Sequence, residues 1–85
     1  MFTEFKENEI ITIDLHKHTV YAAKQKLQLV IAIAPDEIRE IVVIHGYRRG
    51  TALRDMIRKD FSDTRIARKY ISLNPGITSL ILVWD

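Results

Sequence analysis

The spacing of hydrophobic positions changes along this chain. Residues 9–14 and 40–45 (EIITID and EIVVIH) are short, rich in β-branched side chains and typical of buried strands. Between them the apolar positions recur at helical spacing, which predicts a helix that begins after an N-cap at Thr19 and ends before Pro35. The apolar face of this helix consists of Val20, Ala23, Leu27, Val30, Ile31 and Ala34.

The second half of the chain repeats the alternation of helix and strand. Thr51 suits the N-cap of a second helix. The apolar stripe of that helix consists of Leu53, Met56, Ile57 and Phe61. Residues 65–73 alternate in part, residues 74–76 (NPG) are a turn signal, and residues 77–84 read as a last strand.

The predicted order is therefore β-α-β-α-β-β. A strand, a helix and a strand in so few residues form a βαβ unit, so the first two strands should be parallel. We predict an α/β protein of the α+β kind, a two-layer sandwich with a four-stranded mixed sheet and both helices on one face. Residues 9–85 should form this single domain, and residues 1–8 an N-terminal extension.

Composition excludes several classes of protein. The chain has no cysteine, which excludes a disulfide scaffold, a thiolate zinc site and a cysteine nucleophile, and which fits a reducing, cytoplasmic setting. The longest apolar run, residues 29–34, is far too short to span a membrane, so we expect no membrane partner. This run is apolar almost all round, and it predicts a homodimer contact through helix one unless Phe2 and Phe5 cover it.

Positive charge is concentrated in residues 45–70, although the net charge of the chain is only +2. The basic side chains of this segment are Arg48, Arg49, Arg54, Arg58, Lys59, Arg65, Arg68 and Lys69. A basic segment in a nearly neutral domain is typical of proteins that bind a polyanion such as nucleic acid. The alternative is a solvated cationic face without a partner.

Three candidate acid–base groups stand where the first two predicted strands end. Asp14 and His16 lie two residues apart, so in extended geometry they point to the same side. His45 ends the second strand, and the carboxyl ends of parallel neighbours lie on one edge of the sheet. We therefore expect these side chains to converge, although Asp14 could simply cap a turn and a histidine at a strand end is often structural.

The segment after His45 has the composition of a phosphate-binding loop. Gly46 and Gly50 allow close approach of the backbone, and Arg48 and Arg49 between them can donate paired hydrogen bonds to phosphate oxygens. The following helix amino terminus would add free N–H groups. The candidate nucleic-acid contacts are Lys17, Gly46, Tyr47, Arg48, Arg49, Gly50, Thr51 and Arg54. The alternative is a chain reversal with solvated arginines.

These motifs resemble the Smr (small MutS-related) domain family. The family carries "LDLHG" on its first strand, a threonine that opens helix one, and "HG" followed by a glycine-containing loop and "AL". This chain reads IDLH at residues 13–16, Thr19, IHG at residues 44–46 and GTALR at residues 50–54. The resemblance runs from about Ile10 to the carboxyl terminus. Lys17 replaces the usual glycine, and the loop YRR is less glycine-rich than the commonest form.

The resemblance implies a fold like the carboxyl-terminal domain of bacterial translation initiation factor three. It also implies nucleic-acid binding and, as in several family members, endonuclease cleavage of DNA or RNA. The aspartate and histidine of the "DLH" segment would be catalytic and the "HG" loop would contact the substrate. Those roles fall on Asp14 and His16, and on His45, Gly46 and Gly50.

Phosphodiester cleavage suggests one mechanism and two alternatives. His16, oriented by Asp14, is the candidate base and His45 the candidate acid or phosphate donor, with the reverse assignment open. The same three residues could instead hold a divalent metal such as Mg²⁺, although carboxylates are few and no cofactor is expected. The remaining alternative is a nucleic-acid-binding or protein-interaction module without catalysis.

Overall fold

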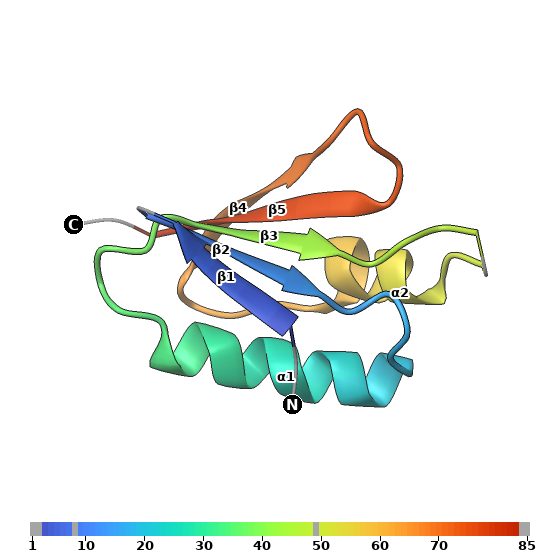
Figure 1. Ribbon diagram of the computed structural model, residues 1–85, viewed down its shortest axis with the longest axis horizontal. Coiled ribbons are helices and arrows are strands. Elements are labelled where there is room, and N and C mark those ends of the chain that lie inside the picture. The colour runs from blue at the N-terminus through green and yellow to red at the C-terminus, as the bar shows by residue number, and fades with distance from the viewer. Residues whose placement is uncertain (1–2, 8, 49, 84–85) are drawn as a thin grey trace.

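The protein, seen here as a computed structural model that describes residues 3–7, 9–48 and 50–83, is a two-layer α+β sandwich (Figure 1). Within these residues five strands form one sheet, and both helical segments cover the same face of it. The elements are β1 (Thr3–Glu7), β2 (Ile10–Asp14), α1 (Val20–Ile33), β3 (Glu40–Ile44), α2 (Ala52–Asp55), a π-helical turn η1 (Met56–Asp60), β4 (Ile66–Ile71) and β5 (Ile77–Leu82). The predicted class of fold is confirmed, as is the predicted order of elements from β2 onward.

The sheet has the strand order β1-β2-β3-β5-β4. As predicted, β2 and β3 are parallel neighbours, with Asp14 beside Ile44 in the register. β5 pairs antiparallel with both β3 and β4, which makes the sheet mixed. The carboxyl ends of β2 and β3 therefore lie at one edge, together with the amino end of β5, where Ile44 pairs with Ile77.

A fifth strand lies where the sequence predicts only an N-terminal extension. β1 pairs antiparallel with β2 over its whole length, so the extension is part of the sheet. This strand has no apolar run because Glu4 and Lys6 alternate with its other residues. An edge strand is held largely by main-chain hydrogen bonds to its neighbour, and such bonds leave little trace in a hydrophobic pattern.

The first helix matches its prediction and the second differs in detail. The Thr19 side chain accepts a hydrogen bond from the Ala22 N–H at 3.1 Å, as an N-cap does. Thr51 is at the N-cap position of α2, as predicted, but its side chain makes no capping hydrogen bond. Only four residues are α-helical there before the backbone widens into η1, where the Phe61 N–H donates to Met56 O at 2.7 Å.

The core lies between the sheet and the helices. It consists of Ile11, Ile13, Leu15, Ala23, Leu27, Val30, Ile31, Ala34, Ile38, Ile41, Val43, Met56, Ile57, Phe61, Leu80 and Leu82. Val20, which the helical spacing assigns to this face, is exposed at the start of α1. Within the described residues, no helix is long and apolar enough to cross a membrane.

The apolar carboxyl-terminal half of α1 leaves two large side chains in solvent. Leu29 is 49% exposed and Ile33 is 61% exposed. Phe5 lies in β1 at the edge of the sheet, and Phe2 lies outside the described residues. The homodimer through helix one therefore remains a prediction, with Leu29 and Ile33 as its exposed apolar residues.

Candidate functional site

An open pocket of about 730 Å³ lies at the carboxyl edge of β2 and β3. Side chains or backbone from the turn after β2, the loop after β3, the start of α2 and the β4–β5 turn line it. Most of the candidate contacts that the sequence predicts line this pocket: Asp14, His16, Lys17, His45, Gly46, Tyr47, Arg48 and Gly50. Arg49 lies outside the described residues, and neither Thr51 nor Arg54 lines the pocket.

Asp14 and His16 form a hydrogen-bonded pair at the rim of the pocket. The Asp14 carboxylate accepts from the backbone N–H of His16 at 3.1 Å, and the same oxygen contacts His16 Nδ1. Because a carboxylate only accepts, Nδ1 carries the proton of the neutral ring and Nε2 has a lone pair. Burial alone would raise the pKa of Asp14, but the hydrogen bonds and charge of His16 outweigh it and lower that pKa. His16 is 47% exposed and has no other partner among the described residues.

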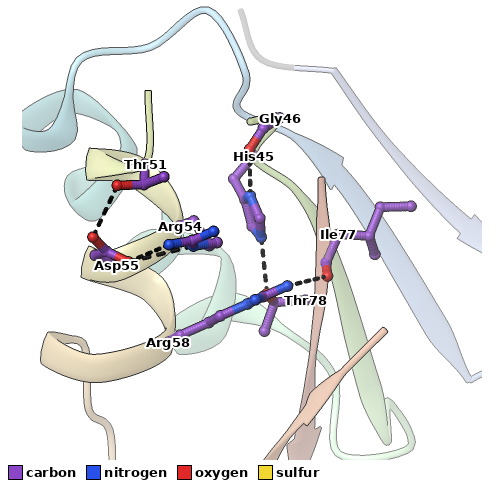
Figure 2. A network of polar contacts seen from close by, with 8 residues as sticks. All are labelled: His45, Gly46, Thr51, Arg54, Asp55, Arg58, Ile77 and Thr78. Carbon is purple, nitrogen blue, oxygen red and sulfur yellow. Dashed lines mark hydrogen bonds and ion pairs between the residues drawn. The ribbon is translucent and has the colours of Figure 1, made fainter. Parts of the chain in front are cut away.

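His45, in contrast, is a buried histidine with two internal partners (Figure 2). Its Nδ1–H donates to Gly46 O at 2.8 Å, and its Nε2 lies 2.8 Å from Thr78 Oγ1. The Arg58 guanidinium donates to the same hydroxyl from Nε at 2.7 Å and to Ile77 O at 3.1 Å. With the proton of the neutral ring on Nδ1, Nε2 has only a lone pair, so the Thr78 hydroxyl donates to Nε2 and accepts from Arg58, which can only donate.

This network favours the neutral form of His45. Burial lowers the pKa of the imidazole, and the charges of Arg58 and Arg54 lower it further, against the opposing effect of the Gly46 hydrogen bond. Both ring nitrogens are engaged and the side chain is only 2% exposed. Neither nitrogen is available to a phosphate in this arrangement. His45 therefore positions the loop after β3 and does not act as a proton donor to a substrate.

The loop after β3 also differs from the predicted phosphate cradle. Gly76 O accepts hydrogen bonds from the backbone N–H groups of His45 at 2.9 Å and Gly46 at 3.0 Å. The Gly46 N–H is therefore not free to bind an anion. Gly46 and Gly50 both have positive φ, which explains glycine at these positions by backbone conformation.

Negative charge is already present where α2 begins. The Thr51 hydroxyl donates to the Asp55 carboxylate at 3.1 Å instead of capping the helix. Arg54 donates to the other oxygen of Asp55 from two guanidinium nitrogens, at 3.2 and 3.3 Å. Arg54 is thus paired within α2, and this short segment is not a vacant anion site.

Three more cations of the basic segment are engaged inside the fold. Arg65 donates to Ile31 O and Ala34 O at the carboxyl end of α1. Lys69 donates to Phe61 O and Arg58 O at the end of η1, and burial lowers its pKa. Arg58 holds Thr78, as described above. Cations at helix carboxyl ends stabilise the helices, so these side chains do not indicate a polyanion partner.

Among the described residues that line the pocket, the exposed cations are Lys17 and Arg48. The Arg48 guanidinium lies 5.8 Å from the centre of the exposed Tyr47 ring. His18 also lines the pocket, and its buried Nδ1 has no hydrogen-bond partner among the described residues. Burial and the charge of Lys26 lower the pKa of His18. In the sequence, the only indication that His18 lies at the pocket is its position two residues after His16.

A metal site does not fit the described part of the chain. No group of three or more His, Cys, Asp or Glu side chains is arranged there to hold an ion. Asp14 and His16 contact each other directly, and the nitrogens of His45 bond to protein atoms.

Comparison of the chain with models of protein families, with curated protein sequences and with solved structures gave no match. The resemblance to the Smr family therefore stands on the sequence motifs alone.

Proposed function

We propose that this protein binds nucleic acid at the pocket on the carboxyl edge of the sheet and cleaves a phosphodiester bond there. The observation that carries the proposal is the Asp14–His16 pair, which presents an exposed imidazole to a pocket that Lys17 and Arg48 also line. The proposal agrees with the Smr-like motifs, whose "DLH" residues coincide with this pair. It differs from the sequence prediction by omitting His45 from the chemistry.

In this mechanism His16 acts through Nε2. The ring takes a proton from an attacking hydroxyl, and Asp14 stabilises the imidazolium through the bond at Nδ1. On RNA the attacking group is the 2′-OH, the P–O5′ bond breaks, and the leaving 5′-oxygen takes a proton from water, so the products are a 2′,3′-cyclic phosphate and a free 5′-hydroxyl. Arg48 and Lys17 would stabilise charge on the phosphoryl oxygens.

A binding module without catalysis is the second candidate. The observation that favours it is the buried network around His45, because it removes one of the two histidines that the sequence prediction assigned to proton transfer. Binding through Arg48 and Lys17 would be unaffected. A cleavage assay therefore distinguishes the two candidate functions, whereas a binding assay does not.

The binding test uses salt dependence. Arg48→Ala should weaken binding to all sequences about equally and lower the slope of log affinity against log salt by roughly 1, because one phosphate contact is lost. Arg68→Ala is the matched control, since Arg68 is also exposed but does not line the pocket. Equal salt slopes for the two variants would contradict a phosphate site at this pocket.

The cleavage test uses the Asp14–His16 pair. His16→Ala and Asp14→Asn should abolish or strongly reduce cleavage of mixed RNA and DNA substrates while sparing binding. Asp36→Asn makes the same chemical change at an exposed loop position and should have no effect. Cleavage that survives His16→Ala rejects the mechanism, and binding without cleavage by the wild-type protein, with or without EDTA, favours the binding module.

A further inference from the structure

The turn between β4 and β5 presents apolar side chains to solvent beside the pocket. Leu73 is fully exposed, Tyr70 is 61% exposed and Ile71 is 52% exposed. The turn chemistry is supplied by residues 74–76, so the tight reversal itself does not require a leucine at position 73. Exposed tips of turns are usually polar, and a cluster of large apolar groups at one indicates a contact surface.

This turn is firmly held. The Asn74 side chain accepts from the Gly76 N–H at 2.9 Å, and the Ser72 hydroxyl accepts from the Asn74 N–H at 3.1 Å. Gly76 O in turn accepts from two N–H groups of the loop after β3. A Cβ atom at Gly76 would lie only 3.3 Å from the Gly46 Cα, so the two loops pack directly on each other.

The turn forms one wall of the pocket. Asn74, Gly76 and Ile77 line it from this side, while His16 and Arg48 line it from the other loops. Figure 1 shows the β4–β5 connection standing out from the sheet at the end where β2 and β3 also terminate. Leu73 itself does not line the pocket, but it directly precedes Asn74, which does, and the exposed cations Lys17 and Arg48 line the same pocket.

We propose that Leu73, with Ile71 beside it, is an apolar wedge that enters the base stack next to a phosphate bound in the pocket. Proteins that insert leucine or isoleucine between base steps unstack them and kink the strand. A continuous duplex resists this insertion, whereas a bulge, junction or loop has already lost part of its stacking. The inference rests on the proposed function and assigns its substrate class as nucleic acid with an interrupted base stack.

The test compares a short duplex with the same duplex carrying a single-nucleotide bulge, and a 2-aminopurine next to the bulge reports unstacking. The wild-type protein should bind the bulged form roughly ten-fold more tightly and raise the 2-aminopurine fluorescence, since partial burial of a leucine side chain between bases contributes about that factor. Leu73→Ser should lose most of this preference and the fluorescence change while keeping its affinity for the continuous duplex. Leu29→Ser, an equivalent change at an exposed leucine on α1, should leave both unchanged.

The outcomes distinguish this inference from the proposed function. Binding of both oligonucleotides with equal affinity, or a full preference in Leu73→Ser, overturns the wedge and leaves nucleic-acid binding intact. Absence of binding to any nucleic acid overturns both. If sedimentation shows that Leu73→Ser dissociates a dimer while the preference for the bulge persists, a second copy of the chain covers this surface and the wedge is rejected.

Discussion

Replacing Thr78 with valine tests whether the buried network at the edge of the sheet has the roles assigned to it. Thr78 is completely buried, accepts from Arg58 and donates to His45, so valine keeps the shape and removes both hydrogen bonds. His45 Nε2 would then be buried without a donor, at a cost of about 1–3 kcal/mol. Arg58 keeps its bond to Ile77 O and is half-buried, so water can replace part of its loss. We expect a total destabilisation of about 2 kcal/mol.

Urea denaturation followed by circular dichroism measures this change. With an m-value of about 1–2 kcal/mol/M for a small domain, the midpoint should fall by about 1 M or more at unchanged m. Thr12→Val is the matched control because Thr12 lies half-buried on the uncovered face of β2, and it should change stability by less than about 0.5 kcal/mol. Nitrogen-15 spectra of the wild-type imidazoles should show His45 as the Nδ1–H tautomer. Equal stability of the two variants, or an Nε2–H tautomer, would refute the assignment of donors and acceptors.

Three further predictions concern residues at this edge of the sheet and at the carboxyl end of α1. The pKa of His45 is lowered from 6.5 in the folded state, so the contribution of His45 to stability should be complete above pH 6.5 and should decrease as the pH falls below it. The free energy of unfolding should fall by up to about 1.4 kcal/mol per pH unit in that range. In urea titrations at several pH values, His45→Gln should show a smaller dependence on pH. Gly76→Ala should cost about 1–3 kcal/mol in the same assay, since its Cβ would press on the Gly46 backbone. Arg65→Met should destabilise by about 1–2 kcal/mol without changing the salt slope of nucleic-acid binding, whereas Arg68→Met, at an exposed position, should leave stability unchanged.

Local patterns predicted the class of fold and the proximity of Asp14 and His16. The period of the apolar positions located β2, α1 and β3, and the spacing of Asp14 and His16 predicted their contact, because both depend on residues close in sequence. The role of His45 depends on Thr78, which lies 33 residues away, and on Arg58 from the helical layer. Such partners become neighbours only when the sheet and helices pack, so the spacing of residues in a short segment does not predict them.

The clustering of basic residues in the sequence did not predict which of them are exposed in the fold. The basic segment suggested one continuous cationic face, yet Arg65 and Lys69 point to backbone carbonyls that need donors. A helix leaves its last carbonyls without partners, and an arginine or lysine from a following strand can reach them. Clustering of basic residues after two helices can therefore reflect capping as well as a polyanion partner.

The two sides of the pocket have different mechanical roles. On the β3 and β5 side, Arg58, Thr78 and His45 join the helical layer to the sheet, and Gly76 O ties the two loops together. On the β2 side, Asp14 is the one described residue that holds the imidazole of His16, which remains accessible. A catalytic group needs a rigid frame to set the position of the substrate, and a reacting atom that the substrate can reach. Variants of the frame should therefore change stability and binding together, whereas variants of His16 should change the chemistry alone.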